Sequence, residues 1–128
     1  MIFNDFICVT NMNIPDCYSI MNGDYENAKA RLMNDRLIDK YLRKFLSDKT
    51  FQQLMDAVEV GDREAVFVAA HTLKGVAANM AFSELEQYSS QLTEQMRSRQ
   101  QDPDPALVAS IADSYRLITD TIGLLDPL

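Results

Sequence analysis

The sequence predicts an all-α domain: an antiparallel four-helix bundle with one or two short N-terminal helices packed across it. Proline occurs only at positions 15, 103, 105 and 127, so residues 16–102 contain none. That stretch has glycine only at 23, 61 and 75, whereas sheet proteins need many more turn residues. Apolar residues also recur every three or four positions, which is the period of an amphipathic helix.

The N-terminal half predicts three helices after a segment without a clear period. We interpret residues 1–20 as a tail or a cap, and residues 21–128 as the bundle domain. Asp24 is the expected N-cap of a short helix that ends near residue 33, and Asn34 the N-cap of the next. A third helix is expected over residues 50–60, with Gly61 as its C-terminal stop.

The C-terminal half predicts the three remaining helices of the bundle. Asp62 precedes a helix over residues 63–80. Ser83 and Glu86 have the spacing of a capping box at the start of the fifth helix. Pro103-Asp104-Pro105 breaks the chain and opens the last helix. Apolar residues of that helix step by 4, 3, 4 and 3, the seam of a helical bundle: Ile111, Tyr115, Ile118, Ile122 and Leu125.

Composition excludes several classes of function. Twelve basic and nineteen acidic residues give a net charge of −7, which disfavours nucleic acids and anionic membrane surfaces as partners. The longest apolar run, residues 65–70, is far shorter than the ~20 residues that span a bilayer. The first ten residues do not resemble a secretory signal. Cys8 and Cys17 both lie in the tail, so we expect reduced thiols and a cytoplasmic location. We also expect a monomer. Since the chain begins with Met1, we expect a free-standing protein.

The single histidine lies on the polar side of the fourth helix. At about 100° per residue, one face is apolar and predicts the core side: Val66, Ala69, Ala70, Leu73, Val76, Ala77 and Met80. His71 projects nearly opposite, among Glu64, Phe67, Val68, Lys74, Gly75 and Ala78. An apolar collar around an imidazole, and a glycine that costs about 1 kcal/mol within a helix, suggest that something large approaches His71.

Each of these residues also has a plainer interpretation. His71 alone is compatible with an ordinary surface histidine, Lys74 with a solvated lysine and Gly75 with a close contact between helices. Glu64 either steers the imidazole or is plain surface charge. One histidine and two distant cysteines give no zinc site, and no nucleotide-binding loop motif occurs.

The combination resembles the signature of histidine phosphotransfer (HPt) domains of bacterial phosphorelays. The core motif is Ala70-His71-Thr72-Leu73-Lys74-Gly75. The resemblance covers roughly residues 20–125 and includes Arg31-Leu32, Phe45, Leu54, Ala57, Asp62, Ala77-Ala78-Asn79 and Leu85. The family often has a glycine just after the motif helix, where this chain has Ala81. A left-handed Ala81 would cost of order 1 kcal/mol, unless Asn79 takes that role.

The resemblance implies a phosphocarrier without kinase activity. His71 would accept a phosphoryl group at Nε2 from a receiver-domain aspartyl phosphate and pass it to another receiver aspartate. Imidazole in general is mostly neutral near pH 7, so no separate base is needed. Lys74 would stabilise phosphoryl charge, and Gly75 would let the receiver approach. Phe67, Val68, Ala78 and Glu64 would contact the receiver domain of a response regulator or hybrid histidine kinase. We expect no cofactor here, because Mg²⁺ would belong to the receiver.

Two alternatives remain. One is a helical adaptor with an incidental surface histidine. The other is the phosphoacceptor domain of a histidine kinase acting with a separate catalytic domain. The motif of such domains usually has a proline soon after the histidine, where this chain has Gly75. The chain contains no nucleotide-binding domain before Leu128, so we do not expect it to phosphorylate itself from ATP.

Overall fold

The computed structural model describes residues 12–127, and its regular structure there is helical. Seven helices follow one another in that part of the chain: α2 (Ile14–Ile20), α3 (Tyr25–Leu32), α4 (Asp35–Phe45), α5 (Thr50–Val60), α6 (Arg63–Met80), α7 (Ser83–Gln95) and α8 (Pro105–Ile122). The predicted all-α class is confirmed.

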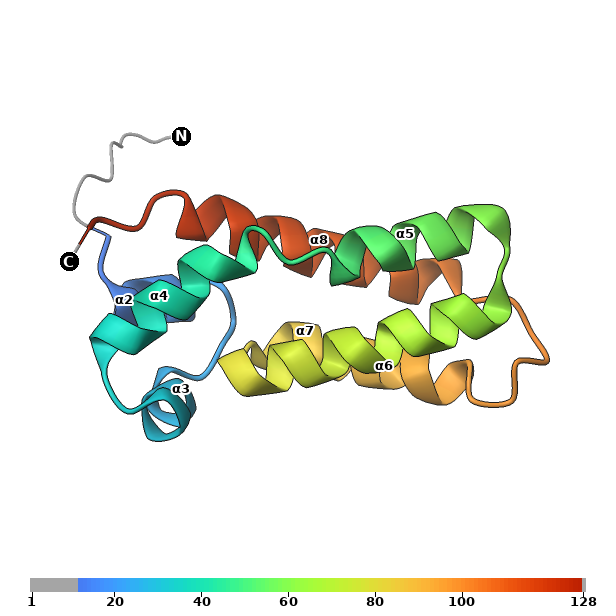
Figure 1. The fold of residues 1–128 in the computed structure, drawn as a ribbon, viewed down its shortest axis with the longest axis horizontal. Helices are drawn as coiled ribbons and strands as arrows, with labels where there is room; N and C mark the ends of the chain where they lie inside the picture. The colour runs from blue at the N-terminus through green and yellow to red at the C-terminus, as the bar shows by residue number, and fades with distance from the viewer. Residues whose placement is uncertain (1–11, 128) are drawn as a thin grey trace.

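Helices α5 to α8 form an elongated four-helix bundle, and α2, α3 and α4 gather at one end of it (Figure 1). Helix α6 packs against α5 and α7, and α7 packs against α8. Two-residue connections after α5 and after α6 make successive helices antiparallel neighbours. Three N-terminal helices stand where the sequence predicted one or two, because α2 forms within the segment interpreted as a tail or cap. A seven-residue helix is too short to show a period.

Polar side chains start the helices where the sequence predicted them. Asp24, Asn34 and Asp62 each accept a hydrogen bond from the backbone N–H three residues later, at 3.0, 3.0 and 3.1 Å. Asp104 accepts one from the N–H of Ala106 at 2.9 Å. Gly61 ends α5 in the left-handed conformation, with φ of 73°. Local signals therefore mark the starts of α3, α4, α6 and α8 and the end of α5.

The predicted capping box at α7 is wrong. Ser83 is already the first helical residue, and the N-cap is Phe82, whose side chain makes no capping bond. The N–H of Glu84 donates instead to the backbone carbonyl of Asn22 at 3.2 Å, and the Asn22 amide donates to the Glu84 carboxylate at 3.3 Å. The loop between α2 and α3 thus supplies this cap, a tertiary contact that local sequence does not encode.

Ala81 ends α6 in the left-handed conformation, with φ of 58°. Helix α6 runs through Met80, so Asn79 is helical and does not take that role. Two contacts hold the turn: the N–H of Phe82 donates to the Ala77 carbonyl at 2.9 Å, and the Ala81 carbonyl accepts from the N–H of Asp24 at 2.9 Å. Tertiary structure thus fixes a conformation that alanine disfavours by about 1 kcal/mol.

The N-terminal helices add buried side chains to the hydrophobic core. The hydroxyl of Tyr18 donates to the Met80 carbonyl at 2.8 Å, and its ring lies 6.0 Å from that of Phe82. Cys17 is a free, buried thiol, and burial raises its pKa to about 11. It therefore stays protonated at neutral pH and packs as a small apolar group. Cys8 lies outside the described residues.

Gly23 should be required for the contact between the α2–α3 loop and the end of α6. A Cβ at position 23 would lie 2.8 Å from the Ala81 carbonyl oxygen and 2.9 Å from Cδ2 of Tyr18. We expect Gly23→Ala to lower the free energy of unfolding by about 1–3 kcal/mol, measured by urea denaturation. Gly61→Ala is the comparison, because its Cβ would meet open space and only the left-handed backbone is strained, by about 1 kcal/mol. A smaller loss at position 23 than at position 61 would show that the loop shifts freely.

Candidate functional site

Helix α6 turns one face into the bundle and the opposite face to solvent. Six of the seven predicted core residues are buried and the seventh, Val76, is half-buried; the buried ones are Val66, Ala69, Ala70, Leu73, Ala77 and Met80. His71 is exposed near the middle of the helix. The helical projection of the sequence is confirmed, and it places the imidazole where another protein can reach it.

Lys74 and Gly75 follow His71 by about one turn. Lys74 is half-buried and Gly75 is exposed. A Cβ built on Gly75 would have no atom within 4 Å apart from its own helix backbone and chain neighbours. Gly75 is therefore not a point of close contact between helices. Its missing side chain leaves open space beside His71.

The predicted apolar collar around His71 consists of Phe67, Val68 and Ala78, and these side chains differ in how far they are exposed. Val68 is 51% exposed, whereas Phe67 and Ala78 are half-buried. The ring of Phe67 lies nearly parallel to the imidazole of His71, with 9° between their planes and 6.2 Å between their centroids. The guanidinium of Arg99 lies 3.7 Å from the Phe67 ring centroid. The surface left for a partner is thus mostly Val68, Ala78 and the rest of the Phe67 ring.

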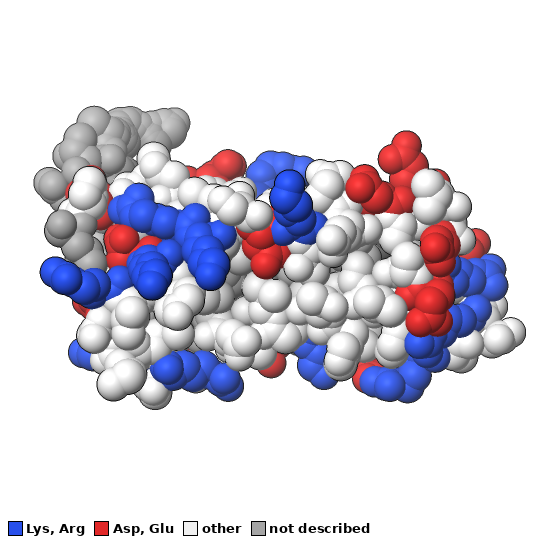
Figure 2. All heavy atoms as spheres, in the orientation of Figure 1, with Lys and Arg blue, Asp and Glu red and all other residues white. Residues whose placement is uncertain are grey.

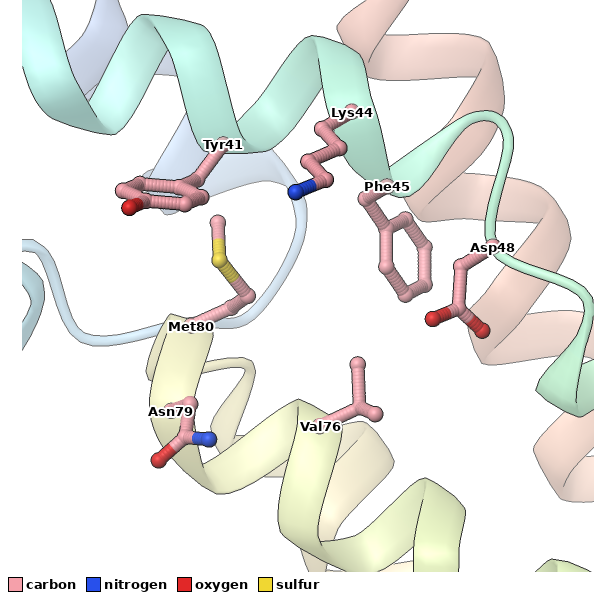
Figure 3. A pocket seen from close by; sticks show the side chains of 7 residues that line it. All are labelled: Tyr41, Lys44, Phe45, Asp48, Val76, Asn79 and Met80. Carbon is pink, nitrogen blue, oxygen red and sulfur yellow. The ribbon is translucent and has the colours of Figure 1, made fainter.

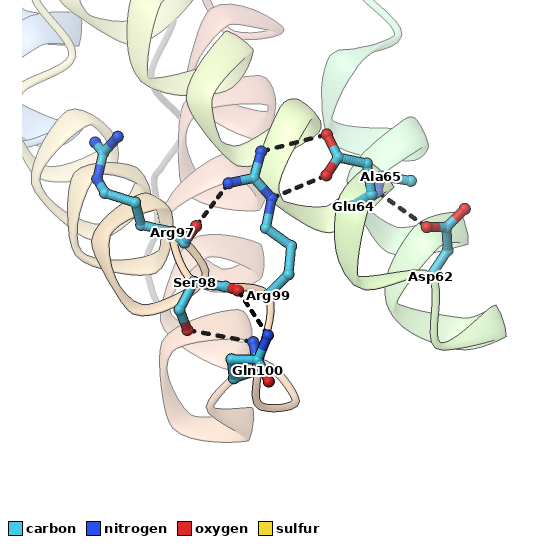
Figure 4. A network of polar contacts seen from close by, with 7 residues as sticks. All are labelled: Asp62, Glu64, Ala65, Arg97, Ser98, Arg99 and Gln100. Atoms are coloured by element: carbon cyan, nitrogen blue, oxygen red, sulfur yellow. Dashed lines mark hydrogen bonds and ion pairs between the residues drawn. The ribbon is translucent and has the colours of Figure 1, made fainter.

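Glu64 is paired with Arg99 and not with the imidazole. Nε and Nη2 of Arg99 donate to the two carboxylate oxygens of Glu64 at 2.9 and 3.3 Å (Figure 4). Among the described residues, none makes a hydrogen bond to the ring of His71. Of the two predicted roles of Glu64, direct steering of the imidazole has no contact to support it. Sequence reasoning missed Arg99, because it follows α7 and has no periodic relation to α6.

A surface pocket lies beside the C-terminal half of α6. Tyr41, Lys44 and Phe45 of α4 face Val76 and Met80 of α6 across it (Figure 3), and Asp48 and Asn79 complete its lining. An uncharged band runs along the same side of the bundle, with Lys and Arg side chains gathered over α4 (Figure 2). The pocket does not include His71, and no sequence signal predicted it because its two walls come from different helices.

Residues 12–127 offer neither a metal-binding cluster nor a membrane-spanning helix. No cluster of three or more His, Cys, Asp or Glu side chains in that range is arranged to hold a metal ion. None of the helices described there is both long and apolar enough to cross a membrane.

Comparison with known families yields a match over most of the bundle. The family model described as Hpt domain matches residues 40–124, well over half of the chain. This range includes α5 to α8, most of α4 and the whole face around His71. No curated protein and no solved structure matches the chain. From the length of the family match and the all-helical fold, the chain belongs to the Hpt domain family of phosphorelay signalling proteins.

Proposed function

We propose that His71 is the phosphoacceptor of this Hpt domain. It accepts a phosphoryl group from the aspartyl phosphate of one receiver domain and passes it to an aspartate of another. Hpt domains act in histidine phosphotransfer as phosphocarriers rather than catalytic enzymes, and they interact with receiver domains. The observation that carries the assignment is that the single histidine of the chain is exposed at the middle of α6, within the matched region.

The transfer needs a free lone pair on one ring nitrogen. Nε2 of the neutral imidazole attacks phosphorus, a P–N bond forms, and the P–O bond to the receiver aspartate breaks and leaves a carboxylate. The proton on Nδ1 stays in place. The reverse sequence returns the phosphoryl group to a second receiver. Phosphoryl transfer depends chiefly on positioning and charge stabilisation, so this chain needs no base of its own, and Mg²⁺ belongs to the receiver.

Lys74 provides positive charge one turn from the nucleophile. Residues three apart on a helix are neighbours on its surface, so the ammonium of Lys74 reaches the space in front of His71. Its half-buried stem limits its motion. There it stabilises the phosphoryl oxygens as charge shifts between donor and acceptor.

The receiver docks on the outer face of α6 around His71. Val68, Gly75 and Ala78 give a weakly apolar surface, and Phe67 adds the part of its ring that Arg99 leaves free. Transient signalling contacts are small, often below about 1,200 Å², and a few central residues dominate them. A small surface of this kind suits a partner that must bind, exchange the phosphoryl group and dissociate.

Replacement of the acceptor tests the assignment directly. His71→Gln should abolish acid-labile labelling by a ³²P-phosphorylated receiver, because no other histidine is present. Since the side chain is exposed, stability should stay within about 0.5 kcal/mol of wild type, checked by urea denaturation. Label retained at the wild-type level would contradict the proposal. Binding of the receiver without any labelling of the wild type would instead indicate an adaptor.

Loss of the Lys74 charge should slow transfer without preventing it. We expect Lys74→Ala to reduce the rate by about tenfold, less than the loss of a buried oxyanion donor, because solvent screens a half-exposed charge. Lys74→Arg keeps the charge and should retain most of the rate. Single-turnover transfer at saturating receiver measures both variants. Equal rates for Lys74→Ala and wild type would remove Lys74 from the site.

A branched side chain at position 75 should block the receiver. Gly75→Leu fills open space, and leucine favours the helix by about 0.8–1 kcal/mol over glycine, so stability should hold or rise. Receiver-driven transfer should fall by about a hundredfold, because a displacement of about 1 Å is enough to spoil in-line attack. Phosphorylation by phosphoramidate, a small donor that needs no docking, is the control and should survive. Wild-type transfer from the receiver would show that it does not dock over Gly75.

A further inference from the structure

We propose that Phe67 is a positioning residue for the imidazole of His71, and that the ion pair of Arg99 with Glu64 holds Phe67 in place. This inference rests on the proposed function of His71 and adds the residues that orient it. None of the three touches the phosphoryl group directly. They act through the conformation of the nucleophile.

The first contact joins Phe67 to His71. Residues four apart on a helix are neighbours, and here their rings lie 9° from parallel with 6.2 Å between centroids. In a helix the side chain of His71 has two favoured χ1 rotamers, since the third clashes with the preceding turn. A ring fixed alongside the imidazole disfavours rotamers that break this stacking. The half-buried Phe67 thus limits the directions in which Nε2 points.

The second contact joins Arg99 to Phe67. The guanidinium carbon lies 3.7 Å from the centroid of the phenyl ring. This is a cation–π arrangement in which the guanidinium covers one face of the ring and restrains it. The neighbouring Arg97 is farther from the ring, at 5.7 Å, and pairs with Glu94. Of these two arginines, Arg99 is therefore the one in close contact with Phe67.

The third contact fixes Arg99 itself. Its guanidinium donates to both oxygens of Glu64, and Nη1 donates to the backbone carbonyl of Arg97 at 2.6 Å (Figure 4). Glu64 precedes Phe67 by three residues on α6, so the carboxylate brings the guanidinium over the phenyl ring. A forked guanidinium can bind a carboxylate with two nitrogens and stack on an aromatic face at once, which lysine cannot do.

The backbone at Arg99 is in a conformation that an arginine rarely adopts. Its φ is 58°, in the left-handed region that favours glycine. Glycine would suit this turn, which connects α7 to α8, better than arginine does. Backbone strain of this kind persists where surrounding contacts fix the conformation, and the Arg99 side chain makes such contacts with Glu64 and Phe67.

This backbone makes Arg99→Gly a clean test variant. The substitution removes the guanidinium and relieves the turn, so the fold should be at least as stable as wild type in urea denaturation. Phe67→Leu removes the ring, and Phe67→Tyr keeps it. Arg116→Gln is the matched control, because Arg116 forms an exposed ion pair with Asp113 within α8.

The first readout is the ring-current shift of the imidazole protons in the free protein. His71 is the sole histidine, so its C–H signals in the NMR spectrum are unambiguous. We expect Phe67→Leu to abolish the shift and Arg99→Gly to reduce it toward that value. Phe67→Tyr and Arg116→Gln should keep the wild-type shift. No receiver is needed, so a docking role cannot produce this pattern.

The second readout is the kinetics of phosphorylation. The maximal rate of receiver-driven transfer should fall by about tenfold in Phe67→Leu and in Arg99→Gly, because in-line attack tolerates little misplacement. The KM for the receiver should rise only in Phe67→Leu, since the Phe67 ring also forms part of the docking surface. Phosphoramidate should lose only about twofold, the cost of a second χ1 rotamer, because a small donor approaches either one. Phe67→Tyr should restore both rates.

Each outcome decides between the roles. An unchanged imidazole shift and unchanged rates in Arg99→Gly would overturn the role of the ion pair. A higher KM with an unchanged maximal rate in Phe67→Leu would show that Phe67 is a docking contact only and would overturn its positioning role. If neither donor labels the wild type, the proposed function fails while the NMR result still reports whether Phe67 orients the ring.

Discussion

The burial of one face of α6 between its neighbours is the constraint on which the rest of the site depends. Helix α6 contacts both α5 and α7, and its inner face buries Val66, Leu73 and Met80 together with three alanines. Rotation of the helix by even one residue would expose this apolar face and bury polar groups, at a cost of several kcal/mol. The rotation of α6 is therefore fixed, and His71, nearly opposite the buried stripe, is held in solvent. The packing of α6 in the bundle therefore decides on which side of the molecule His71 lies.

The N-terminal helices complete the C-terminal end of α6. The last carbonyls of a helix lack partners within it. The Met80 carbonyl accepts a hydrogen bond from the hydroxyl of Tyr18, and the Ala81 carbonyl accepts one from the N–H of Asp24. The loop that carries Asn22 also caps the N-terminus of α7. The segment before the bundle thus holds the end of the helix that carries the histidine, and the left-handed Ala81 is a consequence of this arrangement.

The other end of α6 is arranged by charge. An exposed ion pair such as Arg99–Glu64 contributes little to stability, generally below about 1 kcal/mol. The same pair nevertheless determines where the guanidinium lies, and hence which face of Phe67 is covered. A weak interaction can still set geometry when it selects one conformation among several of similar energy. The face around His71 therefore consists of the α6 backbone, the Phe67 ring with Arg99 over it and an open position at Gly75.

Local sequence determined most of the fold and the location of the histidine. Asp24, Asn34, Asp62 and Gly61 mark helix ends by chemistry that needs only neighbouring residues, and the period of α6 alone places His71 outside the core. The tertiary structure decided what depends on segments far apart in sequence. The carbonyl of Asn22 caps α7 in place of the predicted capping box, and Ala81 adopts the left-handed conformation. Arg99 forms an ion pair with Glu64 and lies over the ring of Phe67. Periodicity and caps report interactions within about one helical turn, whereas these contacts join residues 32 to 62 positions apart, which only the packed chain brings together.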